Sequence, residues 1–224
     1  MSASVHSTLA NSGGRPLVGA KPFDIVAIAA SKGGLAALST VLAGLPENFP
    51  AAIGLVQHLD PSRVSSWAEI LNDRTALAVK WAEEGEPLSA GTVYVAPPNR
   101  HIAVNREKTI ELSDNERVRF WRPSADLFFE SVACSFASRA IAVVLTGMLD
   151  DGAKGLHAIK SRGGRTLAQD PGTAAGFGMP TAAIQTGSVD FVLPLDRIAP
   201  ALITFTMAQG ADRLFQNNQT CFAI

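Results

Sequence analysis

The sequence predicts an α/β fold: a doubly wound, mostly parallel sheet with helices on both faces and a small antiparallel β insertion. Two observations support this. Short apolar runs alternate along the chain with longer stretches of helical periodicity, which is typical of a parallel sheet covered by helices. The first run, residues 24–30, is apolar at nearly every position rather than at every second one. That pattern is expected of a strand buried on both faces.

The same two patterns can be followed from this first strand to the end of the chain. Each predicted helix is bounded by glycine, proline or a short polar stretch, which favour chain reversal. The other strands that we predict in the alternating part cover residues 52–57, 141–145, 165–168 and 189–193, and the helices cover 35–45, 62–71, 125–138, 152–161, 181–186 and 197–209.

The middle of the chain departs from this alternation. Residues 92–96 and 101–104 are apolar and β-rich, and they flank the turn sequence Pro-Pro-Asn-Arg at 97–100. A third short run covers residues 108–112. Strand, turn and strand in this order predict the antiparallel β insertion.

Composition and charge exclude several classes of protein. The 224 residues contain 19 basic and 20 acidic residues, a net charge of −1, which argues against a nucleic-acid partner bound through a broad basic face. Two cysteines cannot form a disulfide framework, and no apolar run approaches the ~20 residues that span a bilayer. The N-terminus lacks the basic start and apolar core of a signal peptide. We therefore expect a cytoplasmic protein without membrane insertion.

The domain organisation predicted from these patterns is simple. Residues 1–22 are small and polar and are interpreted as a flexible N-terminal tail. Residues 23–209 are predicted to form one folded domain, and residues 210–224 are predicted to form a C-terminal tail. Only about 20 residues precede the first strand, so we expect no additional folded domain in front of it.

Three reactive side chains directly follow predicted strands. Ser31 comes after the first strand, His58 after the second, and Asp151 after the turn that follows residues 141–145. Parallel sheets gather the loops at the carboxyl ends of their strands, so these side chains should meet at one edge. Serine as nucleophile, histidine as base and a carboxylate that orients the histidine form a nucleophilic triad.

Each of these residues also has a simpler interpretation. Ser31 could be the N-cap of the following helix, His58 a loop histidine, and Asp151 part of a solvated helix start. The segment around Ser31 matches neither the Gly-x-Gly-x-x-Gly dinucleotide fingerprint nor the Gly-x-Ser-x-Gly elbow of α/β-hydrolases. A nucleotide-binding module is therefore the weakest alternative.

Several segments, in order, carry a resemblance to a known family. Residues 28–34 (Ile-Ala-Ala-Ser-Lys-Gly-Gly) resemble Ile-Gly-Ala-Ser-Thr-Gly-Gly of the chemotaxis protein-glutamate methylesterases, the CheB family. Residues 56–58 resemble the family's Val-Gln-His, and residues 145–153 resemble its Leu-Thr-Gly-Met-Gly-x-Asp-Gly-Ala. Similar landmarks lie at residues 94–101, 122–126 and 169–180. The resemblance covers residues 24–195.

This resemblance implies a serine esterase that hydrolyses glutamate γ-methyl esters on the cytoplasmic helices of methylated chemoreceptors and releases methanol. It implies Ser31 as nucleophile, His58 as general base and acid, and Asp151 as the orienting carboxylate. The backbone groups of Lys32 and Met148 are the implied oxyanion donors. No metal and no cofactor are implied. Several family members also deamidate receptor glutamines, so a glutamine deamidase with the same triad is the nearest alternative.

Three departures from the family pattern lie near the site. Lys32 replaces the usual threonine, Leu149 replaces a glycine, and Ala29 stands where the family has glycine. A non-catalytic CheB-like binding module is therefore a further alternative, although all three triad residues are present. The receiver domain of chemotaxis members is not expected in this sequence, so we expect activity without phosphorylation.

Four other polar residues near these segments have structural interpretations. Arg122 and Asp126 are four residues apart at a helix start, where they could pair with each other or contact substrate. His101 and Asp150 are interpreted as structural.

Overall fold

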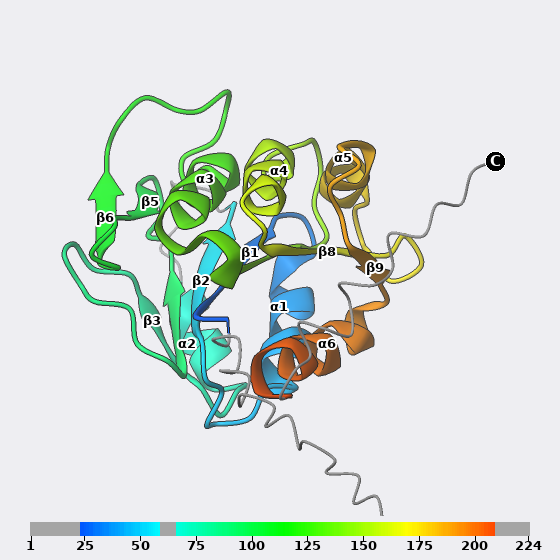
Figure 1. The fold of residues 1–224 in the computed structure, drawn as a ribbon, viewed down its shortest axis with the longest axis horizontal. Helices are drawn as coiled ribbons and strands as arrows, with labels where there is room; N and C mark the ends of the chain where they lie inside the picture. Colours follow the sequence, from blue (N-terminus) through cyan, green and yellow to red (C-terminus); the bar gives the residue numbers. More distant parts are fainter. Residues whose placement is uncertain (1–22, 59–65, 209–224) are drawn as a thin grey trace, which may run out of the picture.

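The computed structural model describes residues 23–58 and 66–208. Its centre is a seven-stranded sheet in the order β3-β4-β2-β1-β7-β8-β9, in which every neighbouring pair is parallel (Figure 1). The strands are β1 (Ile25–Ala30), β2 (Ala52–Gln57), β3 (Ala78–Trp81), β4 (Thr92–Val95), β7 (Ala140–Val144), β8 (Arg165–Gln169) and β9 (Phe191–Leu193). A separate antiparallel pair is made by β5 (His101–Val104) and β6 (Ile110–Ser113).

Helices cover both faces of the large sheet (Figure 1). On one face lie α1 (Gly34–Ala43), α2 (Trp67–Asn72) and α6 (Leu195–Met207). On the other lie α3 (Ala125–Phe136), α4 (Ala153–Ser161) and α5 (Gly178–Gln185). Because alternate residues of a strand point to opposite faces, β1 contributes Val26 and Ile28 to the first core and Ile25 and Ala27 to the second.

The strand order reverses at β1. From β1 the chain crosses to β2 on one side, and it later enters β7 on the other side. Open parallel sheets bind their ligands at the carboxyl ends of the strands beside such a reversal. The loops after β1, β2 and β7 are therefore where a functional site is expected.

The predicted fold class is confirmed, with two corrections within the middle segment. Residues 92–96 were expected to pair with 101–104, but β4 belongs to the large sheet between β2 and β3, and β5 pairs with β6 instead. Strand β3 was not predicted. The proposed tails, 1–22 and 210–224, and the first part of the predicted helix 62–71 lie outside the described residues. Within the described residues, no helix has the length and apolar character needed to cross a bilayer.

Candidate active site

Ser31 lies directly after β1, at the switch between β1 and β7. Its backbone N–H donates to the Thr146 carbonyl (2.9 Å), which ties it to the loop after β7. The N-cap of α1 is Gly33, at a left-handed φ of 81°, and no side chain caps this helix. The N-cap interpretation of Ser31 is therefore wrong. Within the described residues the Ser31 hydroxyl makes no hydrogen bond, so it is not committed to a structural role.

Gln57 joins the ends of β1 and β2. These strands pair in register up to Ala30 and Gln57, so the next residues, Ser31 and His58, are neighbours across the sheet edge. The Gln57 side-chain amide donates to the carbonyls of Ser31 (2.9 Å) and His58 (3.0 Å). A Cβ at Gly34 would lie 1.9 Å from Gln57 Oε1, so only glycine leaves room for this amide. Gln57 belongs to the Val-Gln-His segment at residues 56–58, and this role was not predicted for it.

His58 and Asp151 are brought together as predicted. His58 Nε2 lies 2.8 Å from Asp151 Oδ2, and the two side chains are only 4% and 2% exposed. In a neutral imidazole this contact places the hydrogen on Nε2, which leaves the lone pair on Nδ1. His58 Nδ1 is buried and has no hydrogen-bond partner among the residues that the structure describes. It is therefore the ring nitrogen that is available to accept a proton, the reverse of the usual assignment in serine proteases.

The start of α3 holds the Asp151 carboxylate. Its Oδ1 accepts hydrogen bonds from the Ser124 hydroxyl and the Asp126 N–H (both 3.0 Å), and its Oδ2 accepts one from the Ala125 N–H (2.7 Å). Burial by itself raises the pKa of Asp151. The hydrogen bonds from His58, Ala125 and Asp126 outweigh burial and hold that pKa below its ordinary value. Asp151 is thus kept as an anion that faces the imidazole.

Asp126 links α3 to α4 rather than pairing with Arg122. Its Oδ1 accepts from the N–H groups of Gly152 (3.0 Å) and Gly155 (2.9 Å). Burial is the main cause that raises the pKa of Asp126. The hydrogen bond from Gly155 opposes burial, and the nearby Asp151 charge adds to it. Arg122 instead contacts Asn99 Oδ1 and two backbone carbonyls. Of the two interpretations of Arg122 and Asp126, mutual pairing is therefore not observed among the described residues.

Trp121 covers one face of the candidate base. Its ring lies parallel to the His58 ring, with a centroid distance of 3.8 Å and an interplanar angle of 4°. Trp121 was not predicted as a site residue. Its position, three residues before Ser124, gives no local signal because the stack joins loops that are far apart in the sequence.

Lys32 directly follows Ser31 in the loop after β1, and Met148 lies in the loop after β7. The Lys32 carbonyl accepts from the Thr146 hydroxyl (2.8 Å), which connects the loops after β1 and β7. In the described part of the chain, the N–H groups of Lys32 and Met148 have no hydrogen-bond acceptor. The Lys32 side chain is exposed, and Met148 is 50% exposed.

Ser31 opens onto a cleft of about 360 Å³. The cleft is lined by Ser31, Gly33, Gly34, Leu35, Ala36, Trp67 and Arg74. Among the described residues that line the cleft, Arg74 is the only charged one, and its guanidinium donates to Ser39 Oγ (3.1 Å). An apolar cleft with a serine on its wall can hold a small aliphatic ester beside a cationic group.

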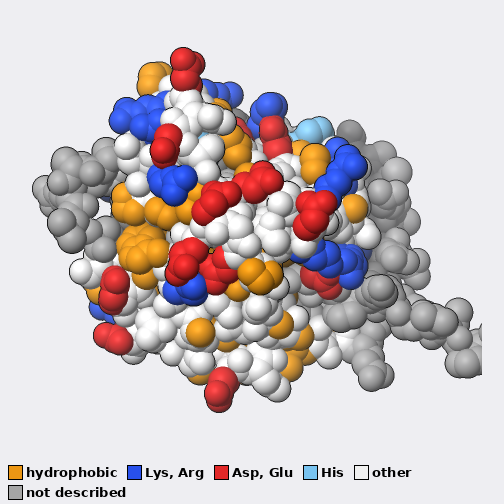
Figure 2. All heavy atoms as spheres, turned by 90° about the vertical axis from the view of Figure 1, so that its left-hand side faces the viewer, with side chains coloured by type: hydrophobic (Ala, Val, Ile, Leu, Met, Phe, Trp, Pro, Cys, Tyr) orange, Lys and Arg blue, Asp and Glu red, His pale blue; other side chains and the backbone are white. Residues whose placement is uncertain are grey.

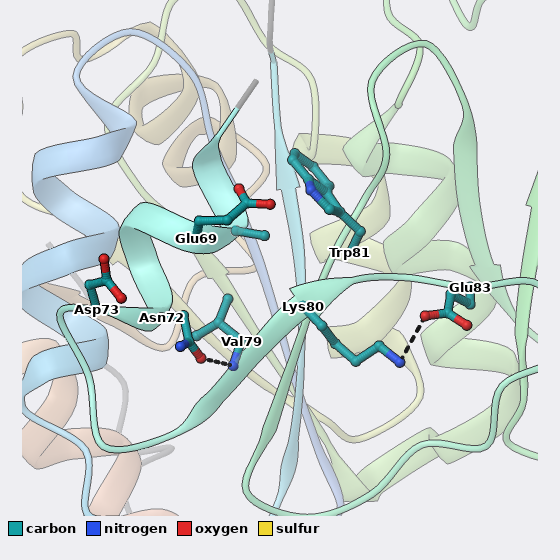
Figure 3. Close-up of a pocket in the computed structure, with 8 residues that line it drawn as sticks. Glu69, Asn72, Asp73, Val79, Lys80, Trp81 and Glu83 are labelled. Atoms are coloured by element: carbon teal, nitrogen blue, oxygen red, sulfur yellow. Dashed lines mark hydrogen bonds and ion pairs between the residues drawn. The ribbon is translucent and has the colours of Figure 1, made fainter. Parts of the chain in front are cut away.

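A second cavity, of about 440 Å³, lies between α2 and the outer strand β3 (Figure 3). Its lysine, Lys80, is paired with Glu83 (3.0 Å), and Asn72 accepts a hydrogen bond from the Val79 N–H. It contains none of the predicted site residues, and β4 separates its strand from β2. This cavity is not a candidate for the chemistry of Ser31.

The remaining polar residues make structural contacts. His101 Nδ1 accepts from the Ser124 N–H (3.2 Å), and Asp150 forms an ion pair with Arg119. Among the described residues, no cluster of His, Cys, Asp or Glu has the arrangement of a metal site. Acidic and basic side chains are interspersed on the face shown in Figure 2, which lacks a broad basic surface.

Comparison with known proteins gives a consistent family match. Residues 26–202 match the family model described as CheB methylesterase. A Leptospira interrogans protein, provisionally named a protein-glutamate methylesterase/protein-glutamine glutaminase, is 41% identical over 88% of this chain and 97% of its own length. The protein-glutamate methylesterase FrzG of Myxococcus xanthus is 44% identical over 81% of this chain.

The match to FrzG covers 54% of that protein, so this chain spans about half the length of such relatives. Among solved structures, the CheB methylesterase catalytic domain of Thermotoga maritima superposes with a TM-score of 0.78 at 38% identity. That match covers 81% of this chain and 97% of the Thermotoga chain. The similarity therefore extends across the described domain.

Proposed function

Because the chain belongs to the CheB methylesterase family, we propose that it hydrolyses glutamate γ-methyl esters through Ser31, His58 and Asp151. The proposed substrates are the cytoplasmic helices of methylated chemoreceptors, which places the activity in the cytoplasm. The observation that carries the mechanism is the His58–Asp151 pair, whose free Nδ1 lies at the same sheet edge as an uncommitted serine hydroxyl.

The first half of the reaction forms an acyl-enzyme. Ser31 Oγ attacks the ester carbonyl while His58 Nδ1 takes the hydroxyl proton, and Asp151 stabilises the imidazolium through Nε2. The backbone N–H groups of Lys32 and Met148 donate to the oxyanion of the tetrahedral intermediate. The intermediate then breaks the bond to the methoxy oxygen. His58 returns its proton to that oxygen, and methanol leaves.

The second half restores the free enzyme. A water molecule attacks the acyl-enzyme carbonyl while His58 Nδ1 takes a proton from it. Collapse of the second tetrahedral intermediate breaks the bond to Ser31 Oγ, which receives the proton back from His58. The product is a glutamate carboxylate. An amide substrate follows the same steps with ammonia as the leaving group, as the glutaminase names of the relatives suggest for those proteins.

The test is methanol release from a methylated chemoreceptor cytoplasmic fragment, with ammonia release from the glutamine form assayed in parallel. We expect Ser31→Ala to abolish both activities while the far-ultraviolet circular dichroism stays unchanged. Ser138→Ala, at an exposed serine whose side chain makes no hydrogen bond within the described residues, should retain activity. Full activity of the Ser31 variant would remove this serine from the mechanism. A wild-type protein that is neither active nor labelled by a fluorophosphonate would favour the non-catalytic binding module.

A further inference from the structure

We propose that Trp121 is a positioning residue for His58, an inference that rests on the proposed function. The indole would hold the imidazole in the plane in which Nε2 meets Asp151 and Nδ1 stays free for the serine proton. The two rings are parallel to within 4° at a centroid distance of 3.8 Å. At this separation the imidazole cannot turn about its Cβ–Cγ bond without displacing the indole.

A tight turn fixes the indole in this position. The backbone groups of Val118 and Trp121 exchange two hydrogen bonds, of 3.1 and 3.0 Å. At the tip of the turn, Arg119 has a left-handed φ of 57°, and its guanidinium forms an ion pair with Asp150. Since Asp150 directly precedes Asp151, the turn that carries the indole is linked to the loop that carries the orienting carboxylate.

The chain that follows Trp121 is anchored as firmly. Arg122 donates to Asn99 Oδ1 and to the carbonyls of Asp114 (2.7 Å) and Asn115 (3.0 Å). Two residues further on, Ser124 begins the group of donors that hold Asp151. One continuous segment, residues 118–126, therefore holds the imidazole of His58 in two ways. Its Trp121 packs against the ring face, and its residues at the start of α3 bind the Asp151 carboxylate that contacts the ring edge.

The indole face also lies where positive charge develops on His58 in the proposed reaction. When His58 takes the serine proton, the imidazolium that forms lies against the electron-rich face of an indole, a favourable cation–π arrangement. The charged groups around it are Asp151 at the ring edge, the Arg119–Asp150 ion pair on the neighbouring loops, and Asp126 behind Asp151. Removing the indole leaves all four of these charged groups in place, so the contribution of the indole to the reaction rate can be measured separately.

The experiment measures the rate at which a fluorophosphonate labels Ser31 in the full chain, together with kcat and KM for methanol release. Trp121→Leu keeps an apolar side chain but removes the aromatic face, and Trp121→Phe keeps an aromatic face. Phe120→Leu is the matched control, since Phe120 lies on the same turn and is 74% exposed.

We expect Trp121→Leu to lower the labelling rate and kcat by about tenfold, with KM little changed. Trp121→Phe should restore most of the rate, and Phe120→Leu should behave as wild type.

Two results would overturn the proposal: a Trp121→Leu variant with the wild-type labelling rate and kcat, or a Trp121→Phe variant as slow as Trp121→Leu. If Trp121→Leu does not fold, the proposal stands or falls on Trp121→Phe, which must keep most of the wild-type labelling rate and kcat. Wild-type protein that is not labelled at Ser31 would instead refute the proposed function itself.

Discussion

The two faces of the central sheet are packed in different ways. The face covered by α1, α2 and α6 is filled by aliphatic and aromatic side chains such as Leu38, Leu42 and Leu202. The face covered by α3, α4 and α5 has an apolar core too, but it also buries Ser124, Asp126 and Asp151 at the carboxyl end of the strands. Apolar burial is non-directional, whereas hydrogen bonds fix direction. The first face therefore stabilises the sheet, and the second also orients the site.

The largest expected effect comes from the polar face. Asp151→Asn should lower kcat by about 10⁴-fold, because an amide cannot hold the imidazole tautomer that leaves Nδ1 free. Methanol release measures it, with Asp196→Asn on the exposed start of α6 as the matched control. Activity within about tenfold of wild type would mean that the carboxylate does not orient His58.

A substitution in the buried core of the apolar face should lower the stability of the domain and leave kcat unchanged. Leu38, which is 1% exposed, lies on α1 in the first core. Leu38→Ala is expected to lower the free energy of unfolding by about 2–5 kcal/mol, through lost burial and the cavity left behind. Urea denaturation measures this loss. At a temperature where the variant is folded, kcat should equal that of wild type, and a tenfold lower kcat would contradict the division between the two faces.

Asp126 tests the link between α3 and α4. Asp126→Ala leaves the N–H groups of Gly152 and Gly155 without their acceptor and should cost about 1–3 kcal/mol of stability. Asp126→Asn keeps an acceptor oxygen and should be milder. If both variants unfold at the same urea concentration as wild type, these hydrogen bonds do not stabilise the domain.

The difference in stability between Asp126→Asn and wild type should depend on pH in a defined direction. The pKa of Asp126 is raised in the folded state, so its ionised form costs stability at neutral pH, and this cost disappears as the pH falls through that pKa. The stability of Asp126→Asn relative to wild type should therefore be greatest at neutral pH and decline toward about pH 4. A difference that grows on acidification would contradict the raised pKa.

The smallest effect is expected at Lys32, whose exposed side chain belongs to neither core. Its backbone N–H is the proposed oxyanion donor, so Lys32→Thr should leave kcat nearly unchanged. The lost charge should raise KM for an acidic receptor surface, and this difference should shrink as salt rises. A hundredfold change in kcat at constant KM would instead make the side chain part of the chemistry.

The sequence predicts the central strands well because their residues are apolar on both faces. β1, β2 and β7 appear close to their predicted limits, and their carboxyl ends bring His58 to Asp151 and Ser31 to the same edge. The error at β4 has a local cause. The turn at residues 97–100 suggested a hairpin, whereas the burial of Val93, Tyr94 and Val95 in succession is the pattern of a central strand.

The residues that surround the triad were harder to predict. β3 is a four-residue edge strand whose lysine and exposed alanine interrupt the apolar pattern. Trp121, Ser124 and Gln57 act through contacts between loops, and periodicity carries no information about such contacts. Asp126 could be read as half of a local pair with Arg122, because spacing on a helix does not reveal that α4 offers better donors.

The topology of the sheet also determines when the site can exist during folding. His58 and Asp151 are 93 residues apart, and their contact requires β7 to be paired with β1. Such non-local pairing forms late and only after a large loss of chain entropy. A chain interrupted before β7 would contain Ser31 and His58 but would lack Asp151, the carboxylate that orients His58. Hydrolytic activity should therefore appear with the completed sheet, and a partly synthesised chain should have none.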